Sequence, residues 1–121
     1  MDILYVIPIF DNKSIANESA WCNYILGLNK TIGMHGVYHT YHEFGTPRNE
    51  SYILEGIDAF EKCFGYKPIL FKAPFLVLSK ENKKTLQNNG FEIQGYPNQV
   101  MHKVYHCAGA GWTSPKLQDW F

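Results

Sequence analysis

The sequence predicts an α/β fold built on a parallel sheet or a partial barrel. Short apolar runs rich in β-branched residues alternate along the chain with longer amphipathic segments, and this order is typical of strands joined by helices. Glycine, proline and asparagine separate the segments, as they do in connecting turns. The 121 residues are enough for one domain around a single core, so we expect residues 1–121 to form one unit.

Each expected strand is an apolar run that ends at polar or turn-forming residues. The expected strands are residues 3–10, 31–34, 68–71, 91–95 and 104–107. Each expected helix begins at a capping side chain and ends near glycine or asparagine. The expected helices are capped by Asn17, Asn49 and Ser79, and they end at Leu28, before Gly65 and at Gln87. The second helix is the clearest, because its apolar residues recur at helical spacing and form one stripe.

Charge and hydropathy argue against two classes of partner. The 11 basic and 11 acidic residues cancel and form no basic stripe, which excludes nucleic acid as an expected partner. No apolar run reaches the length of a transmembrane helix, so we expect no membrane-spanning segment. Aromatic residues make up 16% of the chain, and tyrosine and tryptophan rings can stack on sugars, although a tyrosine-rich core is the simpler interpretation.

The cysteines bear on the compartment in which the chain folds. There are three of them, Cys22, Cys63 and Cys107. An odd count without a CxxC pair predicts neither a disulfide framework nor a zinc ribbon, so we expect reduced thiols. The apolar N-terminus has no basic leader, which favours a cytoplasmic or otherwise intracellular location. Asn-x-Ser/Thr sequons begin at Asn12, Asn17, Asn29 and Asn49. In an asparagine-rich chain without a leader we expect these sequons to be coincidental.

Residues able to carry chemistry follow several expected strands, and in α/β folds function lies in the loops at such strand ends. These residues are Asp11, His35, Lys72 and His106. His35 and His39 are four residues apart, a spacing at which two imidazoles on one helical turn can share a metal ion. Gly36 allows a sharp turn after the strand. The spacing alone is a weak signal, because surface or capping histidines also produce it, and His42 is a weaker third candidate.

Four segments together resemble the polysaccharide deacetylases of carbohydrate esterase family four. Residues 32–40, with His-Gly-Val-Tyr-His, resemble the second motif of that family, in which a strand delivers two histidines four residues apart. Residues 65–74 are similar to its third motif, an arginine-x-proline after a strand. Residues 78–91 match its helix leading to Gly-Phe, and residues 104–106 resemble its last motif, a strand ending in histidine. The resemblance spans residues 4–108.

This resemblance implies a divalent metal ion, usually zinc in the family, with His35 and His39 among its ligands. It implies His106 as the general acid, and it puts Lys72 where the family has an arginine that orients the base. Lysine keeps the charge but lacks the planar fork of arginine. The Asp-Asp motif of the family has no counterpart before the first expected strand. The fold is therefore expected to be a partial or distorted (β/α) barrel truncated at its N-terminal strand, with Asp11 as a substitute carboxylate.

The implied function is a metal-dependent hydrolase that removes acetyl groups from amide-linked carbohydrate. Substrate-binding residues would be Tyr38, Pro74 and Trp112. Two alternatives stay open: a catalytically degenerate relative that binds metal or carbohydrate without turnover, and an α/β interaction module whose histidines are incidental. A barrel without its first strand exposes a sheet edge, and exposed edges pair, so we also expect a homodimer or higher oligomer.

Overall fold

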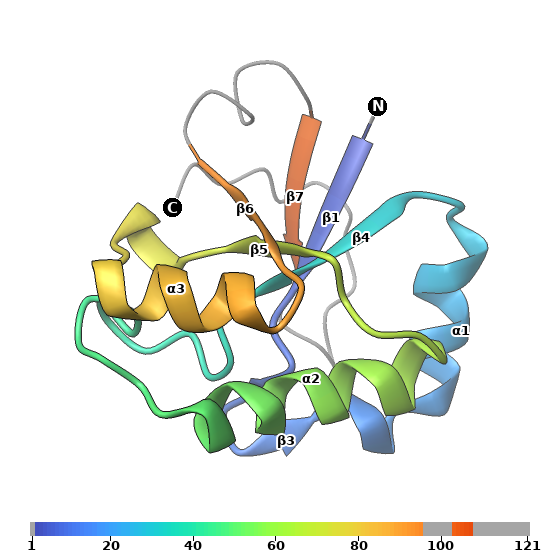
Figure 1. The fold of residues 1–121 in the computed structure, drawn as a ribbon. Coiled ribbons are helices and arrows are strands. Elements are labelled where there is room, and N and C mark those ends of the chain that lie inside the picture. The colour runs from blue at the N-terminus through green and yellow to red at the C-terminus, as the bar shows by residue number, and fades with distance from the viewer. Residues whose placement is uncertain (1, 96–102, 108–121) are drawn as a thin grey trace.

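The computed structural model describes residues 2–95 and 103–107, and its centre is a five-stranded sheet (Figure 1). The strands are β1 (Asp2–Val6), β4 (Thr31–His35), β5 (Leu70–Lys72), β6 (Glu92–Gln94) and β7 (Lys103–Cys107). They lie in the order β6-β5-β4-β1-β7, and every pairing between neighbours is parallel. The prediction of an α/β fold with a parallel sheet is confirmed.

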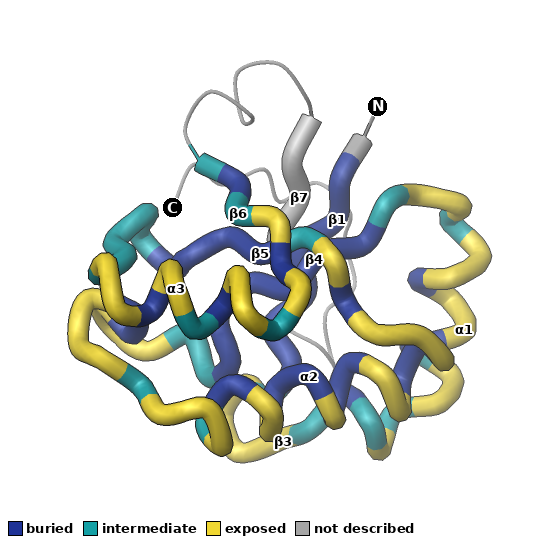
Figure 2. Tube along the Cα trace, viewed as in Figure 1, coloured by how far each residue is buried: buried dark blue, intermediate teal, exposed yellow. Residues whose placement is uncertain are grey.

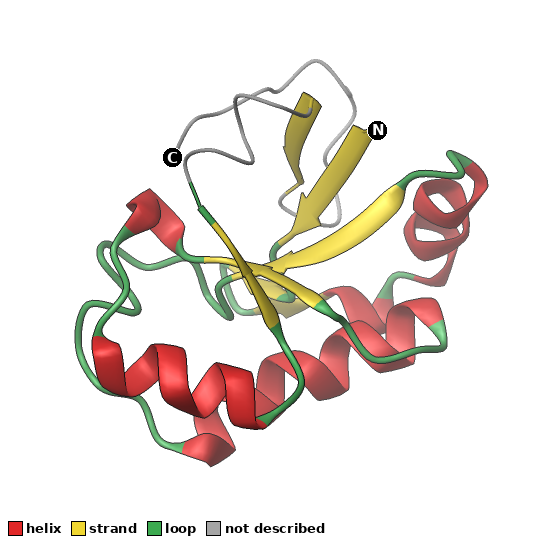
Figure 3. Cartoon of the chain, turned by 45° about the horizontal axis from the view of Figure 1, so that its top comes forward, coloured by secondary structure: helices red, strands yellow, loops and turns green. Residues whose placement is uncertain are grey.

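Helices cover one face of this sheet. They are α1 (Ser19–Gly27), α2 (Glu50–Phe64) and α3 (Lys80–Asn88). Figures 1 and 3 show all three on the same side of the strands. From β1 through β4 and β5 to β6 the chain moves one strand at a time in one direction, and right-handed crossovers in a constant direction put every connecting helix on the same face. None of these described helices has the length and apolar character needed to cross a membrane.

Local capping signals set the ends of α2 and α3. The side chain of Asn49 accepts a hydrogen bond from the backbone N–H of Tyr52, and Gly65 ends α2 in the left-handed conformation with φ of 84°. Ser79 caps α3 in the same way as Asn49 caps α2. Both predicted helices are confirmed at the ends that these residues mark.

The chain between β1 and α1 differs from the prediction. The strand expected over residues 3–10 ends at Val6, because Pro8 has no N–H with which to continue a ladder. The elements that follow are β2 (Ile9–Phe10), β3 (Lys13–Ser14) and the 3-10 helix η1 (Ile15–Asn17). β2 and β3 form a small antiparallel hairpin. Asn17 therefore ends η1 instead of capping α1, whose N-cap position is Glu18.

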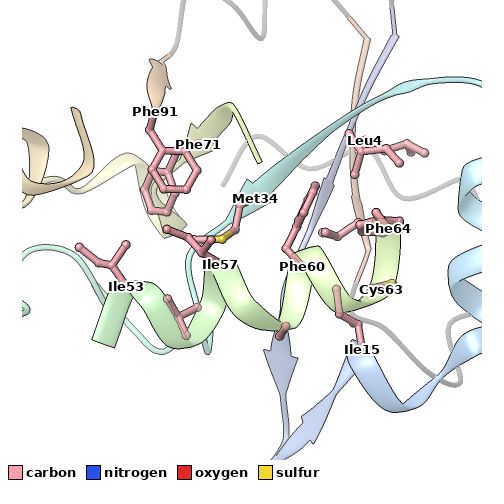
Figure 4. Close-up of a cluster of buried hydrophobic side chains, with 14 of the residues drawn as sticks. Leu4, Ile15, Met34, Ile53, Ile57, Phe60, Cys63, Phe64, Phe71 and Phe91 are labelled. Atoms are coloured by element: carbon pink, nitrogen blue, oxygen red, sulfur yellow. The ribbon is translucent and has the colours of Figure 1, made fainter. Parts of the chain in front are cut away.

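The two faces of the sheet carry different residues, because side chains alternate along each strand. The face towards the helices carries the main core, whose members include Leu4, Met34, Phe60 and Phe71 (Figure 4). On the opposite face Ile3 and Tyr5 form a separate buried cluster with Leu70 beside them. Figure 2 shows buried residues along the strands and exposed residues on the outer sides of the helices.

The sheet is open within the described residues. β6 and β7 form its two edges, and no pairing between them is seen in residues 2–95 and 103–107, so the expected barrel closure is not shown. β1, in contrast, pairs with β4 on one side and along its whole length with β7 on the other. Within the described residues β1 is therefore an internal strand, and the open edges of the sheet are β6 and β7. The oligomer that an open edge would favour stays a prediction.

A disulfide joins Cys22 of α1 to Cys63 of α2, with the two Cα atoms 5.4 Å apart. The expectation of reduced thiols is therefore wrong for this pair. The two cysteines are 41 residues apart in the sequence, and they meet only because α1 and α2 pack side by side. Cysteine count and spacing carry no information on such a contact between helices.

Candidate metal site

The candidate site lies at the carboxyl ends of β4 and β5, on the sheet face opposite the helices. His35 ends β4 in register with Lys72, which ends β5, so both side chains leave the same face. Tyr5 shares that face, and its ring centroid is 6.2 Å from that of His35. Gly33 makes room for this ring, because a Cβ at Gly33 would lie 2.6 Å from a Tyr5 ring carbon. The three side chains are buried.

The neighbouring strand fixes the orientation and protonation of His35. Its Nδ1 lies 2.9 Å from the backbone carbonyl oxygen of Lys72. A carbonyl oxygen only accepts hydrogen bonds, so Nδ1 carries the hydrogen and donates it. The lone pair of the neutral ring is then on Nε2. A histidine held through Nδ1–H to a carbonyl is the usual arrangement of a metal ligand that binds through Nε2.

The second histidine completes a pair of facing nitrogens. Nε2 of His39 lies 3.1 Å from Nε2 of His35, and with both rings neutral His39 donates its Nε2–H to His35. A zinc ion bound by two imidazoles at about 2.0–2.1 Å and a tetrahedral angle would hold the two nitrogens about 3.3 Å apart. The pair thus has nearly the spacing of two ligands of one metal ion, once the ring proton of His39 moves to Nδ1.

The path between the histidines is a loop, whereas the spacing argument assumed a helical turn. His35 is the last residue of β4, and His39 has a left-handed φ of 59°. Gly36 provides the turn, with φ of 65°, as the sequence predicts. The two imidazoles therefore meet because the backbone reverses after the strand.

The carboxylate of Glu43 closes this loop. Its Oε1 accepts hydrogen bonds from the backbone N–H groups of Val37 at 3.0 Å and His39 at 3.2 Å. Its Oε2 accepts from the backbone N–H of Tyr38 at 2.7 Å and from the hydroxyl of Tyr52. Four donors face a side chain with 0% exposure, and this arrangement suits a carboxylate, which accepts at both oxygens.

Burial is the main influence on the titration of this group. It raises the pKa of the Glu43 carboxyl, while the hydrogen bonds from Tyr52 and the backbone and the charge of Arg48 lower it. Burial and Glu43 together raise the pKa of Tyr52, so its hydroxyl keeps the proton that it donates. Arg48 completes the group: its Nε donates to the Glu43 carbonyl oxygen at 2.9 Å, and its guanidinium lies 4.7 Å from the Tyr52 ring centroid.

Space around the loop is tight at Gly36. A Cβ on Gly36 would collide with Oε1 of Glu43 and lie 2.7 Å from Cγ of Pro74. Pro74 is buried and begins the 3-10 helix η2 (Pro74–Leu76), which follows β5. Pro74 thus packs on the turn that separates the histidines. Its predicted contact with substrate stays a prediction.

The other predicted site residues are only partly gathered here. Lys72 is fully buried, with Nζ 5.9 Å from the centroid of the Tyr5 ring, and the contact that it makes to His35 comes from its carbonyl oxygen. The backbone of His106 in β7 is in register with Tyr5 of β1. Asp11 is exposed in the β2–β3 turn, with φ of 52°. Within residues 2–95 and 103–107 no three His, Cys, Asp or Glu side chains form a group that could hold a metal ion.

Tyr38 and Trp112 are the remaining residues predicted to bind substrate. Tyr38 is half-buried and packs against the core, with its ring centroid 5.6 Å from that of Tyr52. Trp112 lies outside the described residues.

The part played by Glu43 was not among the predictions, although an acidic residue four positions after His39 and directly before a buried Phe44 is a usable signal. A carboxylate there can reach back to the backbone N–H groups of its own loop.

An aromatic group lies beside His39. It consists of Tyr41, His42 and Phe75. Phe75 is 5.6 Å from the His39 ring and 5.3 Å from the Tyr41 ring between centroids. His42 stacks on Tyr41 at 3.8 Å, and 76% of Tyr41 is exposed. Flat rings of this kind, next to polar groups, are suited to stacking on the apolar face of a sugar.

The fold and the histidine pair together define an α/β domain with a candidate metal-binding pair at the end of a sheet strand. No protein-family model matches the chain, and no curated protein matches it. A crystal structure of a mutant of a CE4 family pseudoenzyme is similar to it, with a TM-score of 0.60 and 11% sequence identity. The match covers 76% of this chain and 33% of that one. The likeness shows the fold alone: the matched part of this chain has the fold of the corresponding part of that pseudoenzyme, and the chain spans about a third of its length.

Proposed function

We propose that this chain is a catalytically degenerate domain of the polysaccharide deacetylase type, which binds a divalent metal ion and a carbohydrate without turnover. The observation that carries the proposal is the 3.1 Å separation of the Nε2 atoms of His35 and His39, with His35 held by the Lys72 carbonyl oxygen. Imidazole nitrogens suit zinc among the common divalent ions. Two protein ligands predict weaker binding than the three of an active zinc site.

The carboxylates support the degenerate assignment. Deacetylation needs a base to activate water in addition to the metal ion, which when bound supplies polarisation of a carbonyl oxygen and of water. Glu43 is the buried carboxylate nearest in the chain to His39, and both of its oxygens are occupied by four donors. It therefore serves the loop and not a water molecule. Asp11, the carboxylate that the resemblance suggested as a substitute, is exposed in a hairpin turn.

The aromatic group beside His39 supports a carbohydrate ligand. Tyr41 offers an exposed ring face, and Phe75 links that ring to His39. A sugar stacked on Tyr41 would present its substituents towards the histidines, and an N-acetyl group can both accept and donate hydrogen bonds there. The favoured ligand is therefore an N-acetylated sugar.

Metal titration tests the first half of the proposal. Zinc binding is measured by calorimetry and cobalt binding by its visible absorption, with the intact chain and its variants. We expect His35→Ala and His39→Ala each to weaken binding more than about tenfold. The matched control is His42→Ala, which removes an exposed histidine of the same loop and should leave affinity unchanged. Absence of binding by the unmodified chain, or an equal loss in the control, would contradict the proposal.

Sugar titration and an acetate assay test the second half. Chitin oligomers are expected to shift amide NMR signals of residues 38–42 and to bind less tightly to Tyr41→Ala. Tyr24→Ala is the control, because Tyr24 is also exposed but lies on α1. Release of acetate from the oligomers, lost in His35→Ala, would overturn the degenerate assignment and favour the alternative, an active metal-dependent deacetylase.

A further inference from the structure

We infer that this chain is N-glycosylated at its four Asn-x-Ser/Thr sequons and acquires its disulfide in an oxidising secretory compartment. The sequons begin at Asn12, Asn17, Asn29 and Asn49. The inference depends on two independent observations, the number and exposure of the sequons and the Cys22–Cys63 disulfide. It replaces the interpretation of the sequons as coincidental, and it does not depend on metal or sugar binding.

The number of sequons exceeds what composition predicts. The chain has nine asparagines, and ten of its 121 residues are serine or threonine. In random order, nine asparagines would begin fewer than one sequon. The chain has four, and none of them has proline in the middle position, which would block glycosylation. The abundance of asparagine by itself therefore does not account for them.

The fold leaves every sequon asparagine on the surface. Asn12 lies in the β2–β3 turn and Asn29 in the turn between α1 and β4, with φ of 61° and 56°. Asn17 ends η1 and Asn49 precedes α2, and all four side chains are exposed. Turns and helix ends of this kind can hold a large polar substituent in solvent. Asn82, by contrast, is fully buried and begins no sequon.

The geometry at Asn49 shows that a glycan and the helix cap are compatible. The cap uses Oδ1, which accepts from the Tyr52 N–H at 2.9 Å. Ser51, the hydroxyl residue of the sequon, donates to the same Oδ1 at 2.7 Å. A glycan is attached at Nδ2. Modification of Asn49 therefore leaves the acceptor that begins α2 in place.

The disulfide points to the same compartment. Cys22 and Cys63 are both buried between α1 and α2, and disulfides form and persist where the surroundings are oxidising. Asparagine glycosylation takes place in the same secretory lumen. In that reaction the bond from C1 of an oligosaccharide to a lipid diphosphate breaks, a C1–N bond to the asparagine Nδ2 forms, the amide loses one proton, and the lipid diphosphate leaves.

Isotope labelling of the protein from the cells that make it tests the inference. The isolated chain is treated in heavy-oxygen water with an amidase that converts glycosylated asparagine to aspartate, and its peptides are analysed by mass spectrometry. Heavy aspartate is expected at each of the four sites and not at Asn23 or Asn88, which are exposed but begin no sequon. Each site is judged by its own peptide, and four unlabelled peptides would overturn the inference.

A pair of variants separates glycosylation from folding. Ser51→Ala removes the sequon but keeps Asn49 and its cap, whereas Ser51→Thr keeps both. The heavy-oxygen label at Asn49 should disappear in Ser51→Ala and persist in Ser51→Thr. Before glycosylation, the two variants should have equal midpoints of urea unfolding. The last arm traps the thiols of the cells with acid and then alkylates the denatured protein at neutral pH, where free thiols react: Cys22 and Cys63 should stay unlabelled. Labelling of both thiols would contradict maturation in an oxidising compartment.

Discussion

The backbone N–H of His39 donates to Oε1 of Glu43 at 3.2 Å, so a candidate metal ligand is held in place by a carboxylate four residues further along the chain. The contact is made to the backbone of His39 and not to its ring. It stabilises a left-handed φ of 59°, which a histidine adopts only where surrounding interactions compensate. The position of the histidine pair therefore depends on Glu43 through the backbone of the loop.

Glu43→Gln tests that dependence. An amide nitrogen cannot accept, so two of the four donors that face Glu43 would lose their acceptor in a buried position. We expect the free energy of unfolding to fall by about 2–3 kcal/mol, measured by urea denaturation, and metal affinity to fall with it. Glu55→Gln, at an exposed position of α2, is the control and should stay within about 0.5 kcal/mol of the unmodified chain. Equal losses in the two variants would show that the four donors find other partners.

Gly36→Ala tests whether the turn between the histidines is as tight as the structure indicates. The new methyl would be strained by the φ of 65° and would also collide with Oε1 of Glu43. Gly65→Ala separates the two effects, because Gly65 also has positive φ but nothing within 4 Å of its Cβ position. Thermal unfolding should show a loss of about 1 kcal/mol for Gly65→Ala and about 2–3 kcal/mol for Gly36→Ala. A smaller loss at Gly36 than at Gly65 would contradict the predicted collision.

Removal of the disulfide should destabilise the packing of α1 on α2. The cross-link closes a loop of 41 residues, for which the chain-entropy argument predicts about 4 kcal/mol. We expect this loss in the Cys22→Ala, Cys63→Ala double variant, measured by urea unfolding without reductant. Added reductant should lower the stability of the unmodified chain towards that of the variant and leave the variant unchanged. A variant as stable as the oxidised chain would rule out a stabilising cross-link.

Asn82 should hold the segment that follows the histidine loop. Its Nδ2 donates to the carbonyl oxygens of Phe44 at 2.7 Å and Thr46 at 2.8 Å, and its Oδ1 accepts from the Arg48 N–H at 2.7 Å. Asn82→Ala leaves these groups without their partner, so we expect a loss of about 2–3 kcal/mol. Hydrogen exchange at the Arg48 amide should become faster in Asn82→Ala and stay unchanged in the control Asn88→Ala. Unchanged exchange in both would show that solvent or another group replaces Asn82.

Elements whose limits depend on neighbouring residues were predictable from the sequence. Asn49 and Gly65 mark the ends of α2 because a cap and a left-handed glycine act within one helical turn. Pro8 could have marked the end of β1 for the same reason. The disulfide between Cys22 and Cys63 was not predictable, because it arises from the packing of two helices that are far apart in the sequence.

The candidate site shows the same division. The spacing of His35 and His39 indicated that both could bind one metal ion, although it did not indicate that a loop joins them. The acceptor that orients His35 is the backbone carbonyl oxygen of Lys72, and every residue has such a group, so no residue type could signal it. Only the strand register that brings Lys72 beside His35 identifies it.

The alternation of side chains along β1, β4 and β5 has a consequence for how such a domain evolves. Leu4, Met34 and Phe71 lie on the sheet face that packs against the helices. The next residue along each of these strands, which is Tyr5, His35 or Lys72, lies on the other face. Substitution of a residue on the second face leaves the contacts of the first face intact. A lineage can therefore lose catalytic groups one at a time, or acquire a different ligand preference, while natural selection continues to maintain the same folded scaffold.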